Sequence, residues 1–244
     1  EQTTMSMATR NEKSRAPLAI LVNGASSSGK STLCLALQDR LTELSGGASD
    51  AVFALVAFDD FLLMMSDKLY PISFVKLQGG DTTRLISRAQ HDGRAGWEYI
   101  DESHTKGKNG GAPRVRLSLN AGSRRLLSGI HKSWSNHLEL GTNLIIDHFL
   151  QDADWCEEVL QLLQATDAHL LKVGVHCSVT EMERREASRA DGGVEGRPLG
   201  LARRSDELCH GPHLNYDISV WSDQQTTAEA AGMIVKTLQE KNWI

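Results

Sequence analysis

The chain of 244 residues lacks the features that mark several protein classes. No uninterrupted apolar run approaches the ~20 residues that a membrane-spanning helix needs. The formal net charge is -5, so no broad basic surface is available to hold a nucleic acid by its phosphates. The sequence therefore predicts neither a membrane nor a nucleic acid as a partner.

Cysteine is scarce, and its spacing excludes further classes. The four residues Cys34, Cys156, Cys177 and Cys209 include no C-x-x-C pair, and the nine histidines form no H-E-x-x-H pattern. This spacing argues against a zinc site and against a disulfide framework, and it suits free thiols in a reducing compartment. We therefore expect a cytoplasmic protein.

What the sequence does contain is an alternation of apolar runs and helical patterns. Helical patterns cover Lys30 to Leu44, Arg124 to Leu140, Ser178 to about Ala190, and a segment that opens at Thr226. Such alternation predicts an α/β fold with a parallel sheet and right-handed crossovers. The runs that predict its buried strands are Leu18 to Asn23, Val52 to Phe58, Asn143 to Asp147, His169 to His176 and Asp217 to Trp221.

The domain organisation follows from composition. Residues 1–16 are polar and predict a disordered leader, and residues 17–244 predict a single domain. Residues 62–123 are longer than one crossover requires, so we interpret them as a substrate-facing insertion. Residues 189–213 are rich in Gly, Arg and Asp and predict a mobile lid.

Within the insertion, two segments look like strands. They are "WEYID", from Trp97 to Asp101, and "RVRLSL", from Arg114 to Leu119. The stretch "KGKNGG" between them contains the turn pair Asn109-Gly110. The sequence therefore predicts a β-hairpin here.

A phosphate-binding loop is the strongest motif. Residues 24–31 match G-x-x-x-x-G-K-[ST] in full, with a strand before and a helix after. Loop amides converge on phosphate oxygens, Lys30 would reach the β- and γ-phosphates, and Ser31 would ligate Mg²⁺. The predicted cofactors are ATP and Mg²⁺. The predicted nucleotide-binding residues are Gly24, Ala25, Ser26, Ser27, Ser28, Gly29, Lys30, Ser31 and Thr32.

Two predicted strands end in acidic residues. Asp147 ends one of them, where a carboxylate can hold a magnesium water beside the phosphate loop. Asp59 directly follows another, where it could accept the proton of an attacking hydroxyl. Its neighbour Asp60 is a solvated residue or a helix cap in this interpretation. Capping would also account for both Asp59 and Asp60 without any catalytic role.

The predicted lid region carries many arginines. Arg185 and Arg189 are four residues apart, so they share one face of a helix and could stabilise a moving phosphoryl group. Arg184 lacks such a partner. The alternative is a solvated helix in which arginines pair with neighbouring glutamates.

Several of these segments occur together, and in order, in one family. "ILVNGASSSGKST", "FDDFL", "LIIDHFL", "KVGVHCSVTEMERREASRAD" and "GLARRSDELCHGPHLNYDISV" resemble the chloramphenicol phosphotransferase-like proteins over roughly residues 18 to 240. The resemblance implies a three-layer P-loop kinase fold with parallel strand order 2-3-1-4-5. It also implies transfer of the ATP γ-phosphate to a hydroxyl of a small molecule, in that family an antibiotic.

The resemblance also assigns residues. The family's catalytic aspartate falls on Asp59, and the histidine before its final strand falls on His210. Its lid motif falls on Glu183, Arg185, Glu186, Arg189 and Asp191. The sequence departs from the family at His148, where a second acid is usual, and at Trp221-Ser222, where the final strand usually ends in D-T. We expect His148 to be a candidate substrate contact.

Two other functions remain open from the sequence. One is a toxin-type kinase of a nucleotide sugar, whose anionic acceptor would need cations in the insertion. The cations available there are Lys68, Lys76, Arg84, Arg88 and Arg94. The other is a nucleotide-dependent switch, which would not need Asp59. The sequence also leaves a homodimer open, although no stretch predicts one.

Overall fold

The structure of the chain is a computed structural model. It describes residues 15–46, 52–65, 72–75, 84–87, 96–103, 112–191, 198–211 and 214–244. Most of the predicted leader, residues 1–14, lies outside the described residues. At its end, Arg15 Nη2 donates a hydrogen bond to the carbonyl oxygen of Asn242 at 2.9 Å.

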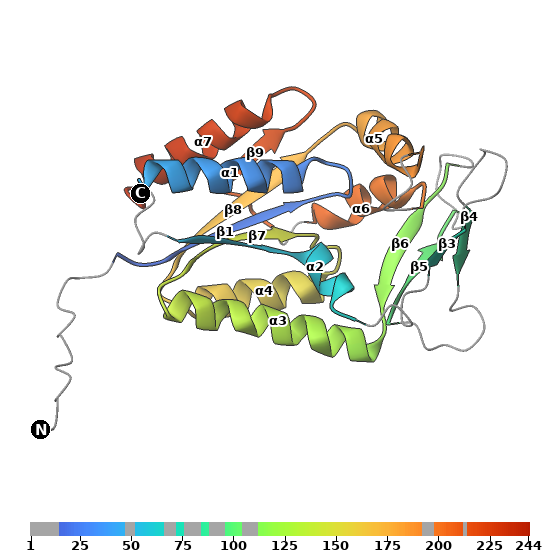
Figure 1. The fold of residues 1–244 in the computed structure, drawn as a ribbon, viewed down its shortest axis with the longest axis horizontal. Coiled ribbons are helices and arrows are strands. Elements are labelled where there is room, and N and C mark those ends of the chain that lie inside the picture. Colours follow the sequence, from blue (N-terminus) through green and yellow to red (C-terminus); the bar gives the residue numbers. More distant parts are fainter. Residues whose placement is uncertain are drawn as a thin grey trace, which may run out of the picture.

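A five-stranded parallel sheet forms the centre of the fold (Figure 1). Its order is β2-β7-β1-β8-β9, which is 2-3-1-4-5 when these five strands are counted along the chain. This is the order that the family resemblance implied. The strands are β1 (Leu18–Gly24), β2 (Phe53–Ala57), β7 (Asn143–His148), β8 (His169–His176) and β9 (Ile218–Trp221). All five predicted strands are present, with ends that differ by one residue at most.

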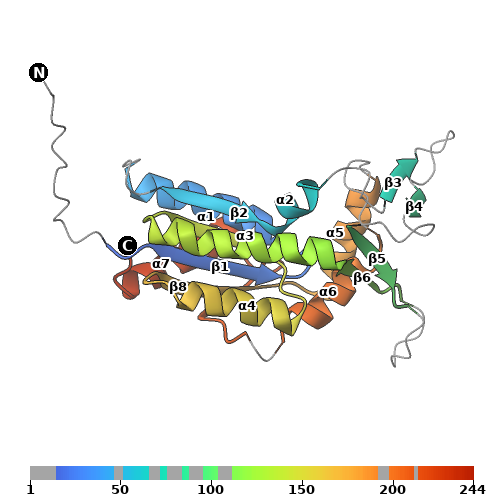
Figure 2. The same ribbon diagram turned by 90° about the horizontal axis from the view of Figure 1, so that it is seen from below.

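Helices cover both faces of the sheet, so the fold has three layers. In Figures 1 and 2, α1 (Lys30–Leu44) and α7 (Thr227–Glu240) lie on one face, and α3 (Ala121–Glu139) and α4 (Ala153–Gln164) lie on the other. All seven residues of β1 are buried, as expected of a central parallel strand. Alternate β1 side chains belong to two separate hydrophobic cores, one on each face.

The insertion contains the predicted hairpin. Strand β5 (Trp97–Asp101) pairs antiparallel with β6 (Val115–Leu119). The predicted turn "KGKNGG" lies outside the described residues. A second antiparallel pair, β3 (Ile72–Val75) with β4 (Arg84–Ser87), was not predicted. The hairpin β5–β6 stands beyond the carboxyl ends of the sheet strands (Figure 1).

The predicted lid segment contains regular structure. Helix α5 (Val179–Asp191) runs into it, and α6 (Leu201–Cys209) lies within it. Residues 201–209 are therefore a helix with buried side chains, in a segment where the sequence shows only a short helical pattern. The lid itself stays a prediction. Two further helices, α4 and the short α2 (Phe58–Leu63), were also not predicted.

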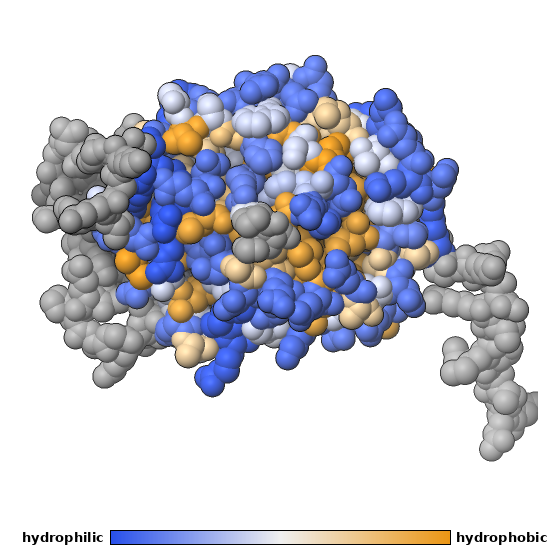
Figure 3. Space-filling model, turned by 180° about the vertical axis from the view of Figure 1, so that it is seen from behind, coloured by the Kyte–Doolittle hydropathy of each residue, from blue (hydrophilic) through white to orange (hydrophobic). Residues whose placement is uncertain are grey.

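The surface carries hydrophilic and apolar residues side by side. On the face seen in Figure 3, apolar residues gather near the centre, with hydrophilic residues around and between them. Among the described residues, none of the helices combines the length and the apolar character that a membrane crossing would require.

Candidate active site

The phosphate loop joins β1 to α1 and has a glycine at each end, one required by backbone conformation and the other by close packing. Gly29 has φ +90°, which disfavours any side chain. Gly24 has an allowed φ, but a Cβ there would lie 2.7 Å from the carbonyl oxygen of Val175. Ser27 also adopts a positive φ of 63°. The predicted loop is thus present, with a strand before it and a helix after it.

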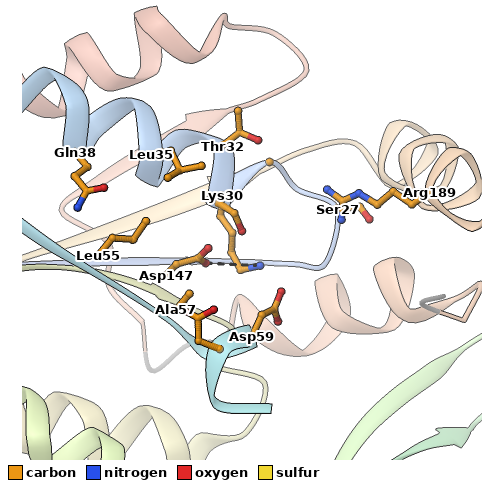
Figure 4. Close-up of a pocket in the computed structure, with 13 residues that line it drawn as sticks. Ser27, Lys30, Thr32, Leu35, Gln38, Leu55, Ala57, Asp59, Asp147 and Arg189 are labelled. Carbon is orange, nitrogen blue, oxygen red and sulfur yellow. Dashed lines mark ion pairs between the residues drawn. The ribbon is translucent and has the colours of Figure 1, made fainter. Parts of the chain in front are cut away.

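A cavity of about 850 Å³ opens beside this loop (Figure 4). It brings together residues from the loop, from β2 and α2, from β7 and from α5. Of the predicted site residues, it includes Asp59, Asp147, Arg189 and the end of the loop. The lining residues are Ser27, Gly29, Lys30, Ser31, Thr32, Leu35, Gln38, Leu55, Ala57, Asp59, Asp60, Asp147 and Arg189.

Lys30 and Asp147 meet in the middle of the cavity. The Nζ atom of Lys30 lies 3.8 Å from Oδ1 of Asp147, and both side chains are nearly buried. Parallel pairing of β1 with β7 sets Val22 opposite Asp147, which brings the β7 end next to the loop. Two of the predicted residues, distant in sequence, are therefore neighbours.

Several buried polar atoms around the loop have no hydrogen-bond partner among the described residues. Within those residues, the hydroxyls of Ser27 and Ser28 make no hydrogen bond, and Oδ1 of Asp147 has only the 3.8 Å ion pair with Lys30. Burial of unpaired polar groups is costly, so such atoms mark where a polar ligand belongs. Nucleotide phosphates beside a carboxylate-held Mg²⁺ fit these atoms, because Mg²⁺ is usually held by one or two carboxylates together with phosphates. The described residues offer no cluster of three His, Cys, Asp or Glu for a metal.

Asp59 occupies the first turn of α2, because β2 ends two residues earlier at Ala57. The predicted strand ran one residue too far, to Phe58. The carboxylates of Asp59 and Asp60 both line the cavity, with Asp59 half-buried and Asp60 exposed. Figure 4 shows Asp59 near Lys30, on the side away from α1.

Arg185 packs directly on the phosphate loop. Its Nη1 donates to the carbonyl oxygen of Ser27 at 3.4 Å and to Oγ of Ser222 at 3.0 Å, and its Nη2 donates to the Ser222 carbonyl at 3.1 Å. Ser222 is one of the positions at which the sequence departs from the family. The hydroxyl and the carbonyl of Ser222 both accept hydrogen bonds from Arg185, so this position makes a polar contact with α5.

The other two arginines of α5, Arg184 and Arg189, point to different sides of the helix. Arg189 lines the same cavity as Ser27, and Figure 4 shows that it comes from α5. Arg184 instead pairs with Glu181 at 2.7 Å on the surface. Hydrogen bonds from Arg184 and then Arg185 lower the pKa of Glu181 to about 2. Arg189 thus lines the cavity, whereas Arg185 lies against the loop outside the cavity lining and pairs with Glu181 at 2.8 Å, the pairing with glutamate that the alternative expected. Their catalytic role stays a prediction.

His148 does not face the cavity, so the expected substrate contact is wrong. It is fully buried, and its Nε2 lies 2.9 Å from Nε2 of His131. His131 Nδ1 in turn lies 2.8 Å from Glu158, whose other oxygen accepts from Arg124 at 2.7 Å. Burial lowers the pKa of His148 well below its usual value. Successive side chains of a strand face opposite sides of the sheet, so the residue after Asp147 points into the α3–α4 layer.

His210 also lies outside the cavity lining. Its ring stacks on His176 at 4.3 Å between centroids, and its Nδ1 lies 2.9 Å from the hydroxyl of Tyr216. Burial, and then the nearby His176, lower the pKa of His210 to about 4. His210 therefore contacts His176 and Tyr216 and does not line the cavity.

Asn23, which the sequence did not single out, joins three segments just before the loop. Its Nδ2 donates to the carbonyl oxygen of Cys209 and to the hydroxyl of Tyr216, both at 2.8 Å. Its Oδ1 accepts from the backbone amide of Leu150 at 2.8 Å. Its place at the end of a buried strand was the only available sign, because a polar side chain buried there must find partners.

Comparison with known proteins places this geometry in context. A sequence model described as chloramphenicol phosphotransferase-like protein matches residues 18–239. A search among curated proteins gave no match.

Solved structures share the fold at low identity. The Mycobacterium tuberculosis APS kinase CysC, in complex with AMPPNP and APS, is 14% identical with a TM-score of 0.55, covering 92% of this chain and 99% of that one. A putative kinase from Chloroflexus aurantiacus is 18% identical with a TM-score of 0.55, covering 93% and 98%. A gluconokinase from Sinorhizobium meliloti is 15% identical with a TM-score of 0.50, covering 93% and 98%. The fold is therefore that of P-loop kinases.

Proposed function

Since the chain belongs to the chloramphenicol phosphotransferase-like family, a family of P-loop phosphotransferases, we propose that it moves the γ-phosphoryl group of ATP to a hydroxyl of a small molecule. The acceptor we propose is an antibiotic or an antibiotic-like metabolite. The observation that carries the proposal is the meeting of Lys30, Asp147 and Asp59 in one cavity beside the phosphate loop.

The residues divide the reaction between donor and acceptor. The loop amides and Lys30 hold the phosphates, and Ser31 and Asp147 would hold Mg²⁺, which neutralises phosphate charge when bound. The acceptor hydroxyl loses its proton to Asp59, its oxygen bonds to the γ-phosphorus, and the bond from that phosphorus to the bridging oxygen breaks to release ADP. Arg185 and Arg189 approach the loop from α5, where their charge stabilises the transferred group.

Charge in the cavity bears on the acceptor. The lining includes three carboxylates, Asp59, Asp60 and Asp147, and two cations, Lys30 and Arg189. Since the phosphates would use the cations, the carboxylates favour a neutral acceptor over a large anionic one, such as a nucleotide sugar. The nucleotide-sugar alternative depends on insertion cations whose side chains are not among those described, namely Lys68, Lys76, Arg84, Arg88 and Arg94.

The experiment is an ATP-consumption screen with hydroxyl-bearing antibiotics and metabolites, in which each product is examined by mass spectrometry for one added phosphoryl group. We expect Lys30→Ala to abolish turnover, because the nearly buried lysine contacts the phosphate site directly. The control is Lys132→Ala, an exposed lysine on α3 that lies outside the cavity lining. Unchanged turnover in Lys30→Ala contradicts the mechanism.

Asp59→Ala separates the kinase from a nucleotide-dependent switch. A kinase variant should bind ATP and transfer nothing, whereas a switch should keep its nucleotide-dependent behaviour. Nucleotide affinity by calorimetry and product formation, measured on the same sample, decide between the two.

The cytoplasmic location and the homodimer stay predictions, which fractionation and sedimentation would test.

A further inference from the structure

Helix α6 contacts the phosphate loop through a buried serine. Ser205 is 1% exposed, and its Oγ accepts a hydrogen bond from the backbone amide of Ser26 at 2.9 Å. The same hydroxyl donates to the carbonyl oxygen of Ala202, also at 2.9 Å, so its orientation is fixed. A loop amide is therefore held by a side chain that is 179 residues away in sequence.

The start of α6 is held in turn by the arginine helix α5. Gly200 precedes α6 and has no side chain with which to cap it. Glu186 of α5 supplies the cap, since its carboxylate accepts from the amides of Gly200 at 2.8 Å and Ala202 at 2.7 Å. Glu186 is 2% exposed. In sequence it stands between the two arginines that reach the site, Arg185 and Arg189.

The hairpin β5–β6 makes a third contact with this corner. The amide of Val115 donates to the carbonyl oxygen of Gly200 at 3.1 Å. A Cβ at Gly200 would lie 2.5 Å from the backbone of Pro113, so the hairpin and α6 approach each other closely. Beside this contact, Glu102 pairs with Arg116 and with Arg204 of α6.

We propose that α6 is a positioning element for the whole phosphate site. Ser205 is the residue that fixes the loop, because it accepts from the Ser26 amide, while the Ser28 amide donates within the loop to the Ala25 carbonyl at 3.2 Å. Glu186 is the residue that joins the same helix to α5, so one helix sets both the loop and the arginines. Neither residue touches the reacting atoms. The effect on phosphoryl transfer rests on the proposed function, whereas the effect on the loop does not.

Amide hydrogen exchange of Ser26 tests the first half without any nucleotide. In Ser205→Ala the amide loses its acceptor, and we expect its exchange to rise at least tenfold beyond that of the β1 amides, which report global unfolding. Ser133→Ala is the matched control, because Ser133 makes the same hydroxyl bond to a carbonyl three residues earlier, on α3. Equal changes at Ser26 and β1, or equal changes in both variants, overturn the role of Ser205.

Nucleotide affinity tests the second half. We expect Glu186→Gln to leave the affinity for MgADP within about twofold. The affinity for MgADP with aluminium fluoride, which mimics the transferred group, should fall about tenfold. Glu183→Gln is the control, because it removes the carboxylate charge from a partly exposed ion pair between α5 and Arg203 of α6, whose atoms lie 2.7 Å apart.

The outcomes separate the two proposals. Equal losses for both ligands in Glu186→Gln, or equal losses in Glu186→Gln and Glu183→Gln, overturn the coupling. The unmodified protein should bind MgADP with aluminium fluoride more tightly than it binds MgADP alone. If it does not, the result counts against phosphoryl transfer. The exchange result at Ser26 would then still decide the role of Ser205.

Discussion

The assignment of Asp59 as the base gives a sharp prediction, because its neighbour is a built-in control. Asp59→Asn removes the proton acceptor while keeping the size and one oxygen of the side chain. Asp60→Asn makes the same chemical change one residue away, in the same turn of α2 and at the border of the same cavity. Only one of these carboxylates is expected to receive the acceptor proton.

The magnitudes follow from their positions. A positioned general base contributes about 10²–10⁴-fold to the rate, so Asp59→Asn should lower kcat by about that factor. Asp60 is exposed, and we expect kcat of Asp60→Asn to stay within about threefold of the original. Either change removes one charge from the first turn of α2, which costs about 0.3–1 kcal/mol in both variants. Stability therefore does not explain a difference in rate between them.

The assay is initial-rate formation of phosphorylated product at saturating MgATP, with nucleotide affinity measured by calorimetry. We expect both variants to bind MgATP as the unmodified protein does. If Asp59→Asn keeps more than a tenth of the rate, or Asp60→Asn loses as much as Asp59→Asn does, the reasoning from position is wrong.

Three further predictions concern the arginines, the sheet and pH. Arg185→Met should lower kcat about 10²–10³-fold, whereas Arg184→Met, whose side chain is 66% exposed, should leave it unchanged in the same assay. Gly174→Ala should destabilise the fold by about 1–3 kcal/mol in urea unfolding, because a Cβ would lie 2.6 Å from a tyrosine ring. Gly129→Ala, in open space on α3, should instead stabilise it by about 0.5–1 kcal/mol, and the opposite order would refute the packing. Burial and its neighbour hold the pKa of His210 at about 4, below the usual 6.5. The unfolded chain therefore binds a proton between these values that the native state does not, so stability falls as pH drops from 6.5 to 4. His210→Gln should flatten this fall in unfolding curves measured across the window, and an unchanged slope would contradict it.

The sequence predicted the features that a local pattern can encode. Apolar runs located the sheet strands, and glycines with Lys30 located the loop, because both depend on neighbours in the chain. Helical spacing placed Arg185 and Arg189 on one face of α5, but it did not predict that Arg185, like Arg184, pairs with Glu181. The hairpin β5–β6 was visible as two strand-like runs, and the structure confirms it.

The sequence could not predict contacts between residues that are far apart along the chain. The position of His148 was misjudged because its partner, His131, lies on α3 and becomes a neighbour only when α3 packs on the sheet. Ser205 looked ordinary for the same reason, since its partner is a backbone amide near the other end of the chain. The extent of α6 could not be predicted, because its helical pattern is short and its cap, Glu186, comes from another helix.

The contacts of Asn23 have a consequence for how the chain folds during synthesis. Its partners lie 127, 186 and 193 residues away, the last being Tyr216. Because β1 is a central strand, it needs β7 and β8 on its two sides before it is paired, and its anchor Tyr216 is synthesised later still. The phosphate site therefore matures only after Tyr216 has emerged, when β9 joins the sheet beside β8. Nascent chains that end before Tyr216 should therefore not bind nucleotide.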